Sequence, residues 1–169
     1  LDATPLLLVP GVLSFAWGGV VRGIAAALGA ELDELVEVHE RLPAPADIDL
    51  GFGVVEAGTT AALRFEVQGI VNGTVRVVLE HVTRLDDDLA PDWPQPAGHS
   101  GYRVIVSGNP NYTVDLQMMG DDGDHNTAGL VGTAARIVNA IPAVCAARPG
   151  LLSVTDLPLV PGRGLLRTD

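Results

Sequence analysis

The chain has 169 residues, a length that predicts one domain with a core of useful size. Its formal net charge is −11 and all ten basic residues are arginine, so nucleic acids and anionic membranes are disfavoured as partners. The absence of lysine excludes Schiff-base and lysine general-base mechanisms. Apolar residues make up 47%, but no uninterrupted apolar run reaches the roughly 18 residues that are typical of a membrane helix.

The first predicted element is a helix from Pro10 to Ala30, where apolar residues recur at spacings of three and four. Gly18, Gly19 and Gly23 weaken such a helix by roughly 1 kcal/mol each relative to alanine, so we expect them to pack closely against another backbone. Leu35 to Arg41 then alternates apolar and polar residues, which predicts a half-buried strand.

A β-hairpin is the next predicted element. The segments Thr59–Val71 and Thr74–Leu85 are rich in valine, threonine, phenylalanine and isoleucine. Asn72 and Gly73 join them, and this dipeptide favours a tight turn because both turn positions need a positive φ.

A second hairpin is predicted from Tyr102–Ser107 and Tyr112–Met118, with residues 108–111 as its turn. A long loop separates the two hairpins, and loops of this length are often functional. Trp93 and His99 lie on this loop, where an aromatic side chain either walls a pocket or covers the sheet.

The last helix is predicted to begin near Asn126 or Thr127, and Pro142 is expected to end or kink it before a short helix through Ala147. The apolar residues that we expect on its buried stripe are Leu130, Val131, Ala134, Ile137, Val138 and Ile141.

Together these elements predict an α+β fold, a mostly antiparallel mixed sheet covered on one face by helices, in a single domain over residues 1–169.

The single cysteine, Cys145, excludes an intrachain disulfide and is expected to be an inert, buried thiol. The first residues lack the basic start of a signal peptide, so a cytoplasmic protein is expected. The chain does not begin with methionine and opens on a helix-entry sequence, as a fragment of a longer protein would.

His81 is the first candidate site residue. Strand alternation places Leu79, His81 and Thr83 on one face of the second strand of the first hairpin. A titratable group and a hydroxyl two residues apart could line a ligand pocket. The alternative is a core or edge histidine that is hydrogen-bonded to the backbone.

The triplet His125, Asn126 and Thr127 is the second candidate, because a helix N-terminus favours an anion such as a carboxylate. The alternative is plain capping by Asn126 or Thr127, with Asp124 stabilising the helix dipole. The acidic residues at 121–124 together with His125 match no calcium loop and lack the histidines or cysteines of a zinc site, so no metal is expected.

Asn139 is the third candidate, a polar residue where a helix is predicted to end against Pro142, so its amide could satisfy exposed carbonyl groups. No G-x-G-x-x-G motif follows a predicted strand, so the chain lacks a dinucleotide-binding fingerprint. The chain alone therefore shows no complete catalytic machinery.

Six segments, in this order and spacing, resemble the dihydrodipicolinate reductase-like oxidoreductases, a group that includes 2,4-diaminopentanoate dehydrogenase and the native amine dehydrogenases. They are Gly58–Phe65, Gln68-Gly69, Glu80–Arg84, Asp88–Trp93, Asp124–Gly129 and Arg136–Pro142.

The resemblance implies the substrate-binding and dimerisation domain of an enzyme whose N-terminal Rossmann domain is absent from this chain. The implied reaction is hydride transfer between NADP(H) or NAD(H) and a C=N or C=C bond, which in the amine dehydrogenase branch is reductive amination of a carbonyl with ammonia. It also implies a homodimer. The glycine fingerprint and the acidic catalytic residue are expected upstream of Leu1, so the chain alone is expected to be inactive.

Residue by residue, the resemblance implies that His81 and Thr83 face the substrate and that Trp93 walls its pocket. His125 and Thr127 would lie near the substrate and nicotinamide, with Asn126 and Asn139 close to the cofactor. Dihydrodipicolinate reductases proper grip a dicarboxylate with lysine, so the absence of lysine favours a smaller, less charged carbonyl or amine. The alternatives from the residues alone are a stand-alone small-ligand binding module and a dimerisation module without catalysis.

Overall fold

The computed structural model describes residues 5–96, 98, 100–121 and 123–160. These residues form two compact units that divide after Pro94, and each unit is described by itself. The described chain is α+β with antiparallel sheets, which confirms the predicted fold class. His99 lies outside the described residues.

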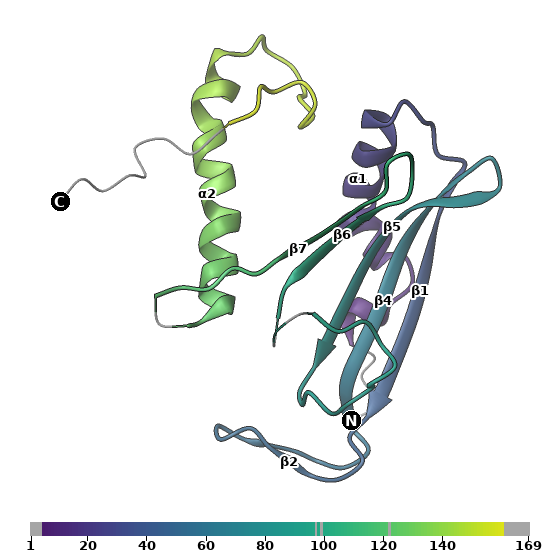
Figure 1. The fold of residues 1–169 in the computed structure, drawn as a ribbon, viewed down its shortest axis with the longest axis vertical. Helices are drawn as coiled ribbons and strands as arrows, with labels where there is room; N and C mark the ends of the chain where they lie inside the picture. The colour runs from purple at the N-terminus through teal and green to yellow at the C-terminus, as the bar shows by residue number, and fades with distance from the viewer. Residues whose placement is uncertain (1–4, 97, 99, 122, 161–169) are drawn as a thin grey trace. The chain divides into compact units, whose positions relative to one another are not determined.

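The first unit is a three-stranded antiparallel sheet with one α-helix against one of its faces (Figure 1). The strand order is β1-β4-β5, so β4 lies in the centre. A two-residue ladder, β2 with β3, forms part of the connection from β1 to β4. The elements are η1 (Leu6–Leu8), α1 (Val12–Ala27), β1 (Glu34–Pro43), β2 (Ile48–Asp49), β3 (Val54–Val55), β4 (Thr60–Val71) and β5 (Thr74–Arg84).

The predicted turn between β4 and β5 is confirmed. Asn72 and Gly73 have φ values of 50° and 69°, and an Asn-Gly pair adopts this left-handed conformation at little cost. The backbone N–H of Gly73 also donates to Asp33 Oδ2 at 3.0 Å, which ties the turn to the residues before β1. The turn sets the β4–β5 register and therefore which side chains share a face of the sheet.

The main core lies between α1 and the sheet. It consists of Leu13, Val21 and Ala25 from α1 with Phe65, Val67 and Val77 from the strands. At Gly69 of β4, a Cβ atom would lie 2.8 Å from Val21 Cγ1, so this glycine allows α1 to approach the central strand.

The expectation for the helix glycines was largely wrong. Of Gly18, Gly19 and Gly23, only Gly18 has a close neighbour among the described residues, and that neighbour is the side chain of Leu35 rather than a backbone. A Cβ atom at Gly18 would lie 2.7 Å from Leu35 Cδ1. Periodicity places a glycine on a helix face, but it does not show whether that face is covered.

A smaller cluster closes the other end of the sheet, where Ala44, Ala61, Ala62 and Leu89 are buried. Trp93 packs against this cluster, which gives the loop after β5 a structural role. The Arg84 guanidinium anchors the same loop, because it donates to the carbonyl oxygens of Leu89, Ala90 and Pro94 at 2.9, 3.3 and 3.1 Å.

The second unit contains the hairpin of β6 (Tyr102–Val106) and β7 (Tyr112–Leu116), followed by α2 (His125–Ala146). This hairpin was predicted and is confirmed. Its register gives it one apolar face, whose six side chains are 46–57% exposed within the described residues. They are Tyr102, Val104, Val106, Tyr112, Val114 and Leu116. The other face carries an ion pair from Arg103 Nε to Asp115 Oδ1 at 2.6 Å.

Four expectations for α2 were wrong. Pro142 lies inside the helix and does not end it, although the ring removes the hydrogen bond that a backbone N–H at this position would donate. Asn139 therefore lies inside the helix, and its side chain is exposed. The predicted buried stripe is exposed within the described residues, and so is Cys145.

By length and composition alone, α2 is apolar enough to cross a membrane, a test that core helices of soluble proteins also pass.

Candidate functional site

The side chains of His81 and Thr83 meet on the face of the sheet that α1 covers. His81 Nε2 lies 2.6 Å from Thr83 Oγ1, and both belong to β5. The predicted strand alternation is thus confirmed, and the His81 ring makes its hydrogen bond with the Thr83 side chain rather than with the backbone. The pair places polar groups beside apolar side chains, since Leu79 on the same strand packs against the core.

Phe65 supports the His81 ring from the neighbouring strand. The two rings stack with centroids 5.0 Å apart and an interplanar angle of 23°. Phe65 is 1% exposed and its other neighbour is Trp17 of α1, at a centroid distance of 5.1 Å. Burial lowers the pKa of His81 below its ordinary value of 6.5, since the charged imidazolium loses hydration there. His81 is therefore a neutral imidazole at pH 7, with one nitrogen that donates and one that accepts.

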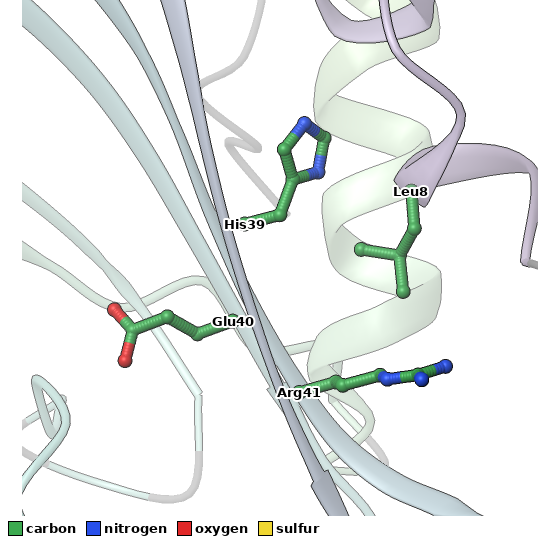
Figure 2. A pocket seen from close by; sticks show the side chains of 4 residues that line it. All are labelled: Leu8, His39, Glu40 and Arg41. Atoms are coloured by element: carbon green, nitrogen blue, oxygen red, sulfur yellow. The ribbon is translucent and has the colours of Figure 1, made fainter.

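A second histidine lies in register with this pair. His39 of β1 is paired with Phe65, which is paired with His81, so the three side chains share one face of the sheet. Figure 2 shows His39 and Arg41 on the side of β1 that faces Leu8, and Glu40 on the opposite side. These four residues line a hollow of about 260 Å³, slightly smaller than a typical ligand pocket.

Glu37, two residues before His39, caps the N-terminus of α1 from the sheet. Its carboxylate accepts hydrogen bonds from the backbone N–H groups of Gly11 and Ser14 at 2.9 and 2.6 Å. Gly11 occupies the N-cap position and has no side chain to do this. His39 Nε2 lies 3.3 Å from the same carboxylate, while His39 Nδ1 is buried without a hydrogen-bond partner among the described residues.

The expected result of Glu37→Ala is a loss of about 1–2 kcal/mol in the free energy of unfolding, because the substitution removes both capping bonds. Burial acts to raise the pKa of Glu37, but the hydrogen bonds from Ser14, Gly11 and His39 outweigh it and hold the pKa below 4.5. The contribution is therefore present above pH 4.5 and is lost as the pH falls through the lower folded-state pKa.

Urea unfolding at pH 7 and at pH 3 measures this contribution. Glu34→Ala is the matched control, since Glu34 begins the same strand and its side chain is exposed. An equal loss for both variants at pH 7 would contradict the capping role of Glu37.

The opposite face of the sheet carries a charged cluster around Arg64. Its guanidinium is paired with Glu40, Glu66 and Glu80, one carboxylate from each strand of the sheet. Gln68 Nε2 also donates to Glu66 Oε2 at 2.6 Å. Three carboxylates around one guanidinium leave this face negative, so it is unsuited to an anionic ligand.

The N-terminus of α2 is capped by Asp124, not by Asn126 or Thr127. Asp124 accepts from the backbone N–H of Asn126 at 2.8 Å and from Thr127 Oγ1 at 2.5 Å. The hydrogen bond from the Thr127 hydroxyl is the largest factor that lowers the pKa of Asp124, so the residue is ionised at neutral pH. His125 is the first residue of the helix and is exposed among the described residues.

The capping by Asp124 limits which part of a dinucleotide cofactor could bind at the start of α2. A carboxylate at the helix N-terminus repels phosphate groups, so the end of α2 does not fit the pyrophosphate of NAD or NADP. The uncharged nicotinamide amide is compatible with the exposed side chains of His125 and Asn126. The described residues therefore fit at most the nicotinamide end of such a cofactor.

The predicted site residues thus form two groups. His81 and Thr83 meet in the first unit, whereas His125, Asn126 and Thr127 follow one another at the start of α2 in the second unit. Trp93 covers the small core cluster of the first unit. Sequence reasoning missed Phe65, Glu37 and His39, although the pairing of β1, β4 and β5 could have placed them on the His81 face.

A family profile for the 2,4-diaminopentanoate dehydrogenase C-terminal domain matches residues 11–164. The chain belongs to this family. The α+β architecture of the dehydrogenase domain and the resemblance seen in the sequence agree with this assignment.

Two relatives share this dehydrogenase domain. An amine dehydrogenase of Streptomyces virginiae is 42% identical over 170 residues, which cover 98% of this chain and 47% of that enzyme. A 2,4-diaminopentanoate dehydrogenase of Acetoanaerobium sticklandii is 29% identical over 138 residues, which cover 80% of this chain and 35% of that enzyme. The chain therefore spans less than half the length of either relative.

The dehydrogenase domain also resembles a solved structure, that of amine dehydrogenase from Mycobacterium smegmatis. The TM-score is 0.56 at 18% sequence identity, and the match covers 83% of this chain and 37% of that protein. At this identity the likeness supports the shared fold.

Proposed function

We propose that this chain is the substrate-binding and dimerisation domain of an NAD(P)H-dependent oxidoreductase that acts on C=N or C–N bonds. The observation that carries the proposal is the neutral His81–Thr83 pair on the α1 face of the sheet, in a member of an amine-acting dehydrogenase family. The pair supplies a hydrogen-bond donor and an acceptor to a small carbonyl or amine.

The polarity around His81 suits an uncharged group. Phe65 and Leu79 make the surroundings of the imidazole apolar, so a carbonyl or a neutral imine loses less hydration there than a carboxylate would. His81 and Thr83 orient the reacting group and hold a proton at Nε2 or Oγ1. This favours a small carbonyl or amine as substrate, in line with the absence of lysine.

The cofactor, NADP or NAD, supplies the hydride when it is bound, and its nucleotide portion is held by a Rossmann domain outside this chain. The ionised Asp124 at the start of α2 supports this division of labour, because it disfavours the cofactor phosphates. His125, Thr127 and Asn126 would then lie near the nicotinamide, with Asn139 on the same helix. The chain alone has no activity.

Dimerisation is supported by the apolar face of the β6–β7 hairpin. Its six large side chains are about half exposed in the described unit, and an apolar surface of this kind is typical of an interface between copies. The first unit thus binds the substrate, and the hairpin forms the contact between copies.

An assay of NAD(P)H oxidation tests the proposed function. The complete gene product, including whatever the reading frame encodes before Leu1, is expected to consume NADPH or NADH when a small ketone or aldehyde and ammonia are both present. The isolated chain is expected to consume neither. Ligand binding by the complete product without any NAD(P)H consumption would favour a binding module instead, and activity of the isolated chain would refute the assigned dependence on a second domain.

A further inference from the structure

The turn between β4 and β5 carries a chemically reactive pair of residues. Asn72 is followed by Gly73, and both residues are exposed to water. The side-chain carbonyl carbon of an asparagine can be attacked by the backbone nitrogen of the next residue, which closes a five-membered succinimide ring. Glycine hinders this attack least, because it has no Cβ atom. The pair that makes the tight turn is therefore also the pair that cyclises most readily.

The other asparagines of the chain each precede a residue that has a side chain. They are Asn109, Asn111, Asn126 and Asn139, followed by proline, tyrosine, threonine and alanine. A side chain on the following residue crowds the attacking nitrogen, and a proline nitrogen has no hydrogen to lose. Asn72 is thus the asparagine that the sequence leaves most open to cyclisation.

A hydrogen bond in the folded protein opposes this attack. The backbone N–H of Gly73 donates to Asp33 Oδ2 at 3.0 Å. Cyclisation requires the Gly73 nitrogen to lose its hydrogen and to turn toward the Asn72 side chain. The bond to the carboxylate holds that hydrogen and keeps the N–H directed at Asp33 instead. The negative charge of Asp33 also disfavours the anion that forms on the attacking nitrogen, since like charges repel at this distance.

The fold brings Asp33 to the turn from a distant part of the chain. Asp33 precedes Gly73 by 40 residues. Its backbone N–H donates to the carbonyl oxygen of Ile70 at 2.8 Å, and the next residue, Glu34, begins β1 in register with Ile70. The contact between Asp33 and the turn therefore exists only while β1 and β4 are paired.

From these contacts we infer that Asn72 is a site of spontaneous covalent modification and that Asp33 keeps the rate of this modification low. When the contact opens, the Gly73 nitrogen bonds to Asn72 Cγ, and the side-chain amide nitrogen leaves as ammonia with the hydrogen that Gly73 gives up. Water then opens the ring at one of its two carbonyl carbons. The product is aspartate or isoaspartate at position 72, and no oxidant or reductant takes part.

The modification changes the hairpin that carries His81 and Thr83. Isoaspartate adds one carbon to the main chain of a two-residue turn, and the geometry of this turn sets the β4–β5 register. Either product also adds a negative charge beside Asp33. We therefore expect the modified hairpin to be less stable than the original one. This inference does not depend on the proposed function, because it concerns the turn alone.

The experiment incubates the complete gene product at pH 8 for several days and measures aspartate and isoaspartate at each asparagine by peptide mapping with mass spectrometry. We expect Asn72 to be converted faster than the other four asparagines. Asp33→Ala is expected to raise the rate at Asn72 by about tenfold, the factor that a hydrogen bond to a charged group typically supplies.

Asp47→Ala is the matched control. Asp47 is also exposed, and its carboxylate accepts from the backbone N–H of Ala57 at 2.8 Å elsewhere in the first unit. This variant loses the same charge and the same kind of hydrogen bond, and it is expected to convert Asn72 at the wild-type rate. In concentrated urea, wild type and Asp33→Ala are expected to react at equal rates, because the protection comes from the fold.

The other outcomes overturn the inference. Earlier conversion of another asparagine would show that Asn72 is not the favoured site. An unchanged rate in Asp33→Ala, or an equal increase in Asp47→Ala, would show that the Asp33 contact gives no specific protection. A slower reaction in Asp33→Ala would identify the carboxylate as a base that promotes the attack.

Discussion

Phe65→Ala is expected to lower the free energy of unfolding of the first unit by about 3–5 kcal/mol, the usual cost of truncating a buried phenylalanine. Phe65 is 1% exposed and contacts Trp17 on one side and His81 on the other. The substitution removes both ring contacts and leaves a cavity between α1 and β4. Urea unfolding followed by tryptophan fluorescence measures the loss, because Trp17 lies next to the cavity.

Phe52→Ala is the matched control for this prediction. Phe52 is 90% exposed, so the same truncation there is expected to change the free energy of unfolding by less than about 0.5 kcal/mol. If the two variants unfolded at the same urea concentration, Phe65 would not hold the core together in the way that its contacts indicate.

His81→Leu and Thr83→Val are each expected to lower kcat/KM for the carbonyl substrate in the complete gene product. Loss of one polar partner leaves the other unsatisfied beside the substrate, at a cost of about 1–3 kcal/mol, which is roughly 5- to 150-fold in rate. Because the two groups lie 2.6 Å apart and act together, the double variant is expected to lose much less than the sum of the two single losses.

The pH profile adds a second test of the pair. Burial lowers the pKa of His81 below 6.5, so the neutral imidazole persists below the pH at which an ordinary histidine gains its proton. The acidic limb of kcat/KM is therefore expected below pH 6.5 and is expected to disappear in His81→Leu. Thr74→Val, at the exposed start of the same strand, serves as the control and is expected to retain the wild-type profile. Additive losses, with an unchanged profile in His81→Leu, would contradict a shared role for His81 and Thr83.

Local patterns predicted most of the elements. The Asn72-Gly73 turn determines the β4–β5 hairpin through the conformations of two residues, and strand alternation then places His81 and Thr83 on one face. Both inferences depend on neighbours in the chain, which is why they hold. The second hairpin, from Tyr102 to Leu116, follows from the same kind of pattern.

Local patterns could not predict the contacts between segments that are distant in the sequence. Glu37 caps a helix that begins 25 residues earlier, and nothing in the local sequence marks it for that role. The sequence showed that the face of α2 that carries Ile137 is apolar. An apolar pattern does not show whether a face is covered, and the described residues leave this one exposed. Pro142 was expected to end or kink the helix, and the helix continues past it to Ala146, so the local rule for proline did not predict where the helix ends.

Contact between the substrate and the His81–Thr83 pair can be seen in a crystal structure of the complete gene product with a bound small amine. The amine nitrogen is expected within about 2.6–3.2 Å of His81 Nε2 or Thr83 Oγ1, the range of a productive hydrogen bond. An amine bound elsewhere, with the His81–Thr83 pair covered by protein, would contradict it.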